Sequence, residues 1–556
     1  MGGAMMPPHA ERLGERLIHQ GALQPEQLRV ALYEQQQNGG MLGEILLELG
    51  FIPRSTLLLL LQDMLQVTAL QHVPQHIPPH LLQRLPPSVA RQCLALPVAQ
   101  QGPVVQVAMA DPHDLLSRDM LQNHLPEGAV LQPCLLPAAD VLDLIAKHYP
   151  DQDDLDRLLF QLDQQRGDDE RGHATHKLVD LLLQRAVHAR ASDIHLEPED
   201  RFVRIRFRID GTLEQAMLLH ADHWPPVAQR LKVLARLNLA HTRLPQDGRF
   251  KATVGGQDID FRISIMPTVW GDNIVLRVLD PRVALRPLAD LGFFPDQVAL
   301  LEKLLARPSG LVLVTGPVGS GKTTTLFALL HLLNKLGRKI VTLEDPVEYQ
   351  LNFIRQTAVQ EAQGLTFGTG VRALLRQDPD VLLIGEMRDA DTAHMALRAA
   401  LTGHRVFSTM HTQDVFGVIP RLFDLGLSPA TLAGHVHAII NQRLVRQHCT
   451  TCAGRASNVV AMTAQGHGCA ACRYTGYAGR TMVAEILELT PAFDDLLLSR
   501  AGRTAWQTLA QQHGFQSLQA RAKQKMAAGI IDHASAADVM DMDAITPPAT
   551  PTEMTP

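Results

Sequence analysis

The residues best suited to chemistry stand in a short glycine-rich stretch near the middle of the chain. Residues 316–325 read GPVGSGKTTT and directly follow the apolar run LVLVT. Glycines in such a turn let backbone N–H groups wrap phosphate oxygens, while Lys322 reaches the β- and γ-phosphates and the Thr323 hydroxyl binds Mg²⁺. The residues expected to hold ATP here are Gly316, Pro317, Val318, Gly319, Ser320, Gly321, Lys322, Thr323 and Thr324. The stretch therefore predicts a P-loop between a strand and a helix.

Two further apolar runs end in acidic residues, which a P-loop needs for hydrolysis rather than binding alone. The run VLLI is followed by Glu386, and the run KIVTL delivers Glu344 and Asp345, with Glu348 close behind. A carboxylate at the carboxyl end of a strand can hold Mg²⁺-bound water or polarise the attacking water. Because the carboxyl ends of parallel strands line one crevice, we expect these acids to lie beside the P-loop.

Two histidines, His404 and His411, flank another short apolar run in the segment TGHRVFSTMHT. If this run is a strand of the same sheet, a histidine beside it can sense the γ-phosphate or polarise water. The residues alone leave a structural and a catalytic role equally open.

Four of the six cysteines form two CxxC pairs separated by sixteen residues. This spacing suits a tetrahedral zinc site in which each pair supplies two thiolates. The predicted zinc ligands are Cys449, Cys452, Cys469 and Cys472. A metal held by four thiolates has no open coordination position, so its role would be structural; disulfides and unligated thiols are the alternatives.

Arginines crowd the segment that precedes the P-loop region. They are Arg204, Arg206, Arg208, Arg243, Arg249, Arg262 and Arg277. Arginines that alternate along a strand usually face solvent, yet phosphoryl transfer often recruits an arginine from another domain or subunit. Some of these side chains are therefore candidates to reach a nucleotide on the P-loop domain.

The composition limits how the chain can position these groups. Its 556 residues suit three or four domains, with 46% apolar residues for their cores. The net charge of −6 argues against a general nucleic-acid coat. The sequence starts without a basic run followed by an apolar block, and the run Leu57 to Leu61 is too short to span a bilayer. We expect a cytoplasmic protein that reaches a membrane only through partners.

An internal repeat opens the sequence, because residues 41–64 repeat the leucine and glycine pattern of residues 12–35. Each unit reads as a short helix, a glycine stop and a second helix that begins beside a proline. Two tandem helical hairpins, packed on each other, are therefore expected.

Shifts in pattern divide the rest of the chain. A long alternation of strands and helices in the second half predicts a largely parallel sheet, and the Pro/Thr-rich end is expected to be disordered. The expected divisions are a tandem helical module 1–67, a small α+β subdomain 68–150, a linker 151–176, a second α+β domain 177–285, an α/β domain 286–535 with a zinc-binding insertion 449–472, and a tail 536–556.

Together these motifs resemble those of the ATPases of type II secretion and type IV pilus assembly. The resemblance covers nearly the whole chain and rests on RASDIHLEP, FRIDG, RLPQDGR, GPVGSGKTTT, LEDPVEY, LRQDPDVLLIGEMRD, TGHRVFSTMHT and the paired CxxC, in that order. It implies an α/β fold, with a RecA-like P-loop ATPase domain preceded by a PAS-like α+β domain and a largely helical N-terminal module. It also implies ATP, Mg²⁺ and Zn²⁺ as cofactors, and a homo-hexamer that docks on an inner-membrane platform protein.

The resemblance also assigns roles to residues. The expected catalytic residues, from an acidic box, the Walker B position and a histidine box, are Glu344, Glu386, His404 and His411. The further ATP contacts, from the acidic box and from arginines that approach the γ-phosphate, are Asp345, Glu348, Arg262 and Arg277. The expected magnesium ligands are Thr323 and Glu386.

The tandem repeat resembles the motif by which some of these ATPases bind cyclic di-GMP. That motif has two 24-residue units separated by five residues, as residues 12–35 and 41–64 are. The residues that match its ligand contacts are Arg12, Leu13, Gly14, Leu28, Leu32 and Gln35. The second unit departs from the motif at Met41 and Met64, where polar or basic residues are usual. Because methionine offers only apolar contact, an effector site and a docking module for a membrane-anchored partner are both open.

The leading hypothesis is an ATP-hydrolysing motor for pilus assembly or type II secretion. The alternatives are a second-messenger-sensing nucleotide switch, acting as an adaptor, and a ring-shaped nucleic-acid translocase. No nucleic-acid partner is expected, because the acidic balance and the few aromatic residues leave no groove on which bases could stack. The shared motifs do not distinguish a pilus, a pseudopilus or a competence system.

Overall fold

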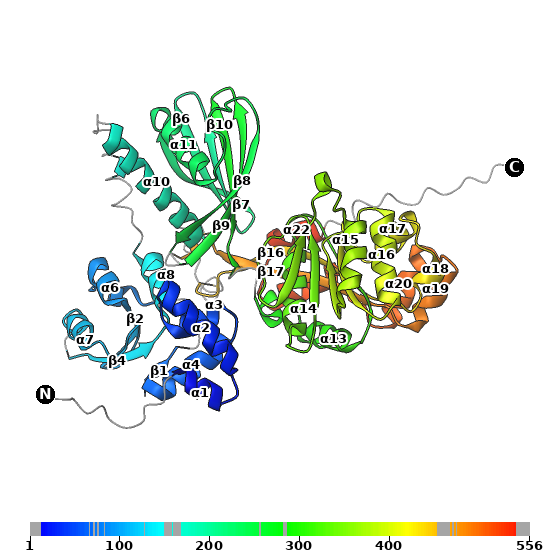
Figure 1. Cartoon of the computed structure of the whole chain (residues 1–556), viewed down its shortest axis with the longest axis horizontal. Helices are drawn as coiled ribbons and strands as arrows, with labels where there is room; N and C mark the ends of the chain where they lie inside the picture. Colours follow the sequence, from blue (N-terminus) through cyan, green and yellow to red (C-terminus); the bar gives the residue numbers. More distant parts are fainter. Residues whose placement is uncertain are drawn as a thin grey trace. The chain divides into compact units, whose positions relative to one another are not determined.

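The computed structural model describes most of the chain as two compact units, residues 1–278 and 279–556 (Figure 1). The described residues are 13–65, 67–70, 73–74, 77–82, 84–126, 128–149, 158–159, 168–254, 257–281, 286–452, 468–469, 472–473 and 475–540. Within them, none of the helices combines the length and the apolar character needed to cross a membrane.

Four helices open the first unit as two tandem hairpins. They are α1 (Leu13–His19), α2 (Pro25–Asn38), α3 (Leu42–Glu48) and α4 (Arg54–Leu65). Both hairpins turn in the same way, because Gly21 and Gly50 have φ values of 69° and 68°. The next amide in each case donates a 2.9 Å hydrogen bond, to the carbonyl oxygen of Leu17 or of Leu46. Both leucines are fully buried, so the structure has the repeated hairpins that the sequence predicts.

A small sheet follows, in the order β1-β4-β3-β2. Its strands are β1 (Thr68–Ala69), β2 (Ala95–Gln101), β3 (Val104–Met109) and β4 (Val130–Leu135). The helices around it are α5 (Pro79–Leu82), α6 (Pro87–Cys93), α7 (Leu115–Gln122) and α8 (Ala138–His148). Leu58 of α4 packs against Ala69 and Leu135, and Arg54 forms an ion pair with Asp140. These contacts attach the helical module to the small sheet.

The rest of the first unit is a six-stranded sheet in the order β7-β6-β5-β10-β9-β8, with α10 (Asp168–His188) and α11 (Trp224–Leu234). Its strands are β5 (Ala191–Pro198), β6 (Phe202–Ile209), β7 (Thr212–His220), β8 (Gln246–Val254), β9 (Gln257–Thr268) and β10 (Gly271–Leu279). Helix α10 begins at Asp168, inside the expected linker. Because Ala174 and Thr175 are buried, packing extends the helix through a stretch whose polar composition suggested a linker; residues 151–157 and 160–167 lie outside the described part.

The second unit is built on a seven-stranded sheet in the order β13-β12-β14-β15-β11-β16-β17. Its strands are β11 (Gly310–Thr315), β12 (Ile340–Glu344), β13 (Ile354–Ala358), β14 (Val381–Ile384), β15 (Arg405–Met410), β16 (Val436–His448) and β17 (Tyr477–Glu488). All neighbouring pairs are parallel except β16 with β17, which confirms the predicted largely parallel sheet.

Helices cover both faces of this sheet, as its buried central strands require. One core joins α13 (Pro295–Ala306) and α14 (Lys322–Leu333) to one face. A second core joins α15 (Phe367–Leu374), α16 (Ala390–Leu401), α17 (Val418–Asp424) and α18 (Pro429–Leu432) to the other (Figure 1). The unit ends with α19 (Asp494–Leu498), α20 (Arg503–Gln512), α21 (Leu518–Ala527) and α22 (His533–Met540).

The expected disordered tail of residues 536–556 needs a correction at its start. Helix α22 continues to Met540, and Ala536 and Val539 are fully buried in a small core with α21 and the β16–β17 hairpin. Packing of these small apolar side chains therefore keeps the chain ordered past the predicted boundary. Residues 541–556 lie outside the described part.

Candidate functional site

The loop between β11 and α14 has the backbone of a phosphate cradle. Gly316, Gly319 and Gly321 have φ values of 142°, 78° and 86°. A Cβ at Gly316 would lie 2.5 Å from the carbonyl oxygen of Gln442 and 2.7 Å from Ser320 Oγ, so a larger residue would not fit. Ser320 is buried, and its Oγ has no hydrogen-bond partner among the described residues. A tight glycine turn with an unused hydroxyl, at the start of a helix, suits a bound phosphate.

Lys322 and Thr323 occupy the first turn of α14. The Nζ of Lys322 donates to the carbonyl oxygens of Gly316, at 2.9 Å, and Pro317, at 3.0 Å. Burial lowers the pKa of Lys322; the charge of Glu386 raises it and that of Arg443 lowers it further. The lysine is thus held over the loop, within electrostatic reach of the predicted catalytic glutamate.

Glu386 follows β14 at the carboxyl edge of the sheet, and its side chain is 17% exposed. Its Oε2 accepts a 2.7 Å hydrogen bond from Arg388 Nε, and its Oε1 lies 3.5 Å from His411 Nε2. Arg388 also lies 3.8 Å from Asp345. The structure therefore brings three of the predicted site residues, Asp345, Glu386 and His411, to one place near Lys322.

Glu344 ends β12 and is buried beside the same edge. Its Oε1 accepts hydrogen bonds from Thr342 Oγ1, at 2.5 Å, and from Gln356 Nε2, at 3.0 Å. Burial raises the pKa of Glu344, and the charge of Glu348 raises it further. A carboxyl group whose pKa is raised in this way is better suited to accept a proton near neutral pH than an exposed glutamate.

The expectation that both histidines lie at the nucleotide site needs a correction for His404. Strand β15 separates the two, and seven residues along a strand span roughly 23 Å. His404 Nδ1 contacts the carbonyl oxygen of Ala399 at 3.0 Å, and its own carbonyl oxygen accepts from Gly310 N at the start of β11. His404 therefore lies at the amino end of β15, whereas His411 and the P-loop lie at the carboxyl ends of their strands.

Three polar residues of β16 that the sequence motifs did not indicate lie against the P-loop or against the loop that follows His411. Gln442 Nε2 donates to the carbonyl oxygen of Ser320 at 2.8 Å. Arg443 and Asn441 both donate to the carbonyl oxygen of Gln413, two residues after His411. The available signal was the polar pair Asn-Gln directly after the apolar run AII in β16, since buried strand positions seldom carry polar side chains without a structural use.

Arg262 and Arg277 lie on the neighbouring strands β9 and β10 of the first unit, while the P-loop belongs to the second. Arg277 Nε donates to Asp193 Oδ1 at 3.2 Å. Arg262 stands opposite Arg249 across the β8–β9 pair. Their approach to a γ-phosphate stays a prediction.

The four predicted zinc ligands lie together. The Sγ atoms of Cys449, Cys452, Cys469 and Cys472 all lie within 4.8 Å of one another. The Cys449–Cys469 and Cys452–Cys472 pairs are each 3.9 Å apart, far longer than a disulfide bond. Four ligands in a tetrahedron about 2.3 Å from zinc would be about 3.8 Å apart, so the sulfur positions fit a zinc ion.

The predicted effector residues of the helical module lie on α1 and α2, except Arg12, which lies outside the described part. Gly14 is buried against Leu28, whose Cδ1 would be 2.5 Å from a Cβ at that glycine. In the second hairpin, a Cβ at Gly43 would lie 3.1 Å from Leu57 Cδ1. The other matched residues are Leu13, partly buried in the module core, Leu32, which is 40% exposed, and Gln35, which bonds the Gly40 carbonyl at 2.9 Å.

Comparison with known proteins gives a consistent result. The profile of the family described as Type II/IV secretion system protein matches residues 168–540, and that of the MshEN domain matches residues 74–155, which follow the tandem repeat. The chain is 35% identical over 549 residues to the type IV pilus assembly ATPase PilB of Myxococcus xanthus, covering 93% of this chain and 97% of that protein. It is 40% identical over 427 residues to the type II secretion system protein E of Klebsiella pneumoniae, covering 74% and 83%.

A solved structure supports the fold as well. The ATPase DotB of Legionella pneumophila matches 66% of this chain and 95% of its own, with a TM-score of 0.51 and 22% identity.

Proposed function

We propose that this chain, an ATPase that belongs to the Type II/IV secretion system protein family, is a homo-hexameric motor for type IV pilus assembly or type II secretion. The observation that carries the proposal is the convergence of Lys322, Glu386 and His411 at the carboxyl edge of the parallel sheet. The motor would be cytoplasmic and attached to the inner membrane through a platform protein and a membrane-anchored component.

In the proposed mechanism each residue acts on the triphosphate or on the attacking water. Lys322 leaves its carbonyl partners to bind the β- and γ-phosphates, and the P-loop amides hold the remaining oxygens. Glu386 polarises the attacking water, while His411 and Arg388 keep its carboxylate in place. Thr323 and Glu386 would hold Mg²⁺, which would supply positive charge that offsets the charge on the phosphates.

The remaining predicted residues complete this proposal. Glu344 accepts a proton at the same carboxyl end of the sheet. The negative charges of Asp345 and Glu348 contribute to the electrostatic potential around this carboxyl group. Arg262 and Arg277 supply charge to the γ-phosphate from the first unit, within a chain or across the ring. The four-cysteine site holds a structural zinc ion, because four thiolates leave no open coordination position.

The test measures turnover and assembly on the full chain. Lys322→Ala is expected to abolish ATP hydrolysis while circular dichroism and melting temperature stay those of the wild type. Native mass spectrometry with Mg²⁺ and a non-hydrolysable ATP analogue is expected to show six chains. Normal turnover in the variant would contradict the assigned site, and a monomer under these conditions would contradict the ring.

A second function, effector binding by the helical module, is favoured by the duplicated packing of its hairpins. The Gly14–Leu28 and Gly43–Leu57 contacts repeat, and Leu32 exposes part of an apolar side chain beside the first. We propose cyclic di-GMP as the effector. Calorimetric titration of the full chain should show binding that Leu32→Asp removes; no heat in the wild type would favour a docking module instead.

A further inference from the structure

Glu485, on β17, is a buried carboxyl group that the mechanism above does not use. The residue is 4% exposed. Its Oε1 accepts hydrogen bonds from Asn441 Nδ2, at 2.9 Å, and from Val415 N, at 3.1 Å. Its Oε2 accepts from Leu518 N at 3.0 Å. One rigid group therefore joins three segments that are far apart in the sequence.

Two of these segments belong to the nucleotide site. Val415 lies in the connection between β15 and α17, in the stretch 411–415 that begins with His411 and is called the 411–415 loop below. Thr412 N in this loop donates to Thr315 Oγ1 at 2.9 Å, at the end of the strand that leads into the P-loop. Asn441 Nδ2 holds the loop a second time, through the carbonyl oxygen of Gln413 at 2.9 Å. The oxygen Oε1 of Glu485 thus fixes the loop that carries His411.

The third segment is the start of α21. Leu518 is the first residue of this helix, and the N-cap Ser517 accepts from Ala520 N. An acceptor oxygen at the N-terminus of a helix is favourable, because the first amides there have no partner within the helix. Leu518 and Ala522 then pack with α22 and with the hairpin strands β16 and β17. The oxygen Oε2 of Glu485 thus anchors the C-terminal helices.

We propose that Glu485 is a positioning residue that couples the 411–415 loop to α21, so that ATP turnover and the placement of the C-terminal helices depend on one another. The inference rests on the proposed role of His411 at the nucleotide. The two carboxyl oxygens move as one body, so a carboxyl group that follows the loop through Oε1 also carries Oε2 away from Leu518 N. Both sites therefore contact one group whose position each of them can change.

The substitution Glu485→Gln separates the two connections while keeping the shape of the side chain. One oxygen becomes an NH₂ group, which cannot accept a hydrogen bond from an N–H donor. If the remaining side-chain oxygen faces the loop, it keeps the hydrogen bonds from Asn441 and Val415. If it faces α21, it keeps only the hydrogen bond from Leu518 N. We therefore expect Leu518 N to lose its acceptor while Val415 N keeps its own.

The experiment combines hydrogen exchange and steady-state kinetics on the full chain. In the wild type, exchange over residues 518–527 should differ between ADP and a non-hydrolysable ATP analogue. In Glu485→Gln this difference should disappear, and the Leu518 amide should exchange roughly 10- to 100-fold faster, as expected when a buried donor loses its acceptor. The kcat should fall by roughly tenfold while KM changes less than about twofold, because the P-loop contacts remain.

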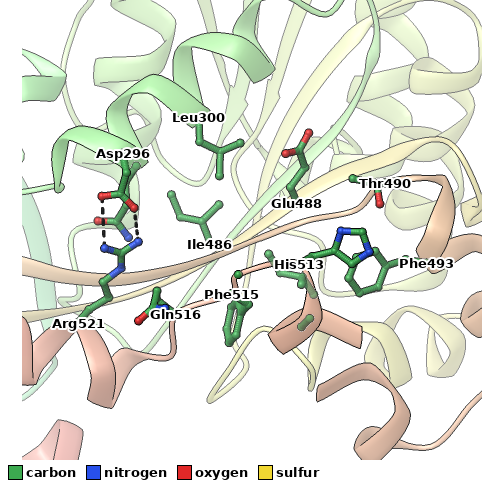
Figure 2. A pocket seen from close by; sticks show the side chains of 14 residues that line it. Asp296, Leu300, Ile486, Glu488, Thr490, Phe493, His513, Phe515, Gln516 and Arg521 are labelled. Atoms are coloured by element: carbon green, nitrogen blue, oxygen red, sulfur yellow. Dashed lines mark hydrogen bonds and ion pairs between the residues drawn. The ribbon is translucent and has the colours of Figure 1, made fainter. Parts of the chain in front are cut away.

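Arg521→Gln is the matched control, because Arg521 also anchors α21 but touches neither the loop nor the P-loop. Figure 2 shows its guanidinium facing the carboxylate of Asp296, on α13, in a pocket beside β17. This variant should also speed exchange in α21, yet keep kcat and the nucleotide-dependent difference.

Three results would overturn the coupling. These are no nucleotide-dependent difference in the wild type, an unchanged difference in Glu485→Gln, or an equal loss of kcat in the control. Failure of the proposed function would appear elsewhere, as normal turnover in Lys322→Ala or His411→Ala.

Discussion

Replacement of Glu386 by glutamine tests the proposed chemistry most directly, because the two side chains have the same shape. The structure predicts a small effect on stability. Glu386 pairs with Arg388, whose side chain is 60% exposed, and an ion pair with an exposed partner is worth at most about 1 kcal/mol. The loss of a group that polarises the attacking water is larger, roughly 10²- to 10⁴-fold in rate, or about 3–5 kcal/mol of activation free energy. The two effects are therefore separable.

The assay measures turnover, ATP affinity and unfolding of the same preparation. Glu386→Gln should bind ATP within a few-fold of the wild type, since Lys322 and the P-loop glycines are unchanged. After one addition of ATP, the variant should keep its bound ATP unhydrolysed. Its melting temperature should be close to that of the wild type. Turnover within tenfold of the wild type would refute the reasoning, because water activation would then have to come from another residue.

Three further predictions follow from other parts of the chain. A zinc chelator should release one zinc ion per chain, measured by a zinc-sensitive dye, and should speed hydrogen exchange at the amide of Cys449, which donates to the Gly476 carbonyl; Cys472→Ser should contain no zinc. Burial lowers the pKa of Lys525 to about 8, so above that pH the unfolded chain binds more protons and stability rises with pH. By about pH 9.5 this rise should reach at most about 2 kcal/mol in urea titrations, and Lys525→Met should lack it. Leu17→Ala removes a fully buried side chain of the helical module and should lower the module's unfolding free energy by about 2–5 kcal/mol, with turnover unchanged.

Much of the arrangement of the candidate site could be predicted from the sequence because its signals are local. The P-loop glycines, Lys322 and Glu386 stand next to the strands that position them, so pattern and position coincide. The prediction placed His404 at the wrong end of its strand, and the direction of the strand explains why. A residue that precedes a parallel strand lies at the edge opposite the carboxyl ends, and only His411 follows β15.

The contacts of Glu485 could not be predicted in the same way. Its partners Val415, Asn441 and Leu518 are brought together by the order of strands β11, β16 and β17, which no local pattern encodes. The starts and ends of helices were misjudged for a related reason. Polar residues around Asp168 suggested a linker, and the tail predicted from the Pro/Thr-rich end was started at residue 536, yet tertiary packing made both stretches helical.

Strand β16 gives the ATPase unit a mechanical property. It runs for 13 residues, with Gln442 against the P-loop and His448 directly before the first cysteine. The seven residues from Gln442 to His448 span roughly 20 Å of strand and pair with β17, with one register shift between Arg446 and His448. A paired strand resists stretching, so a displacement of the four-cysteine cluster, where β16 ends, would be passed along the hairpin to Gln442. A partner that binds the four-cysteine cluster would then act on the P-loop without contacting a nucleotide.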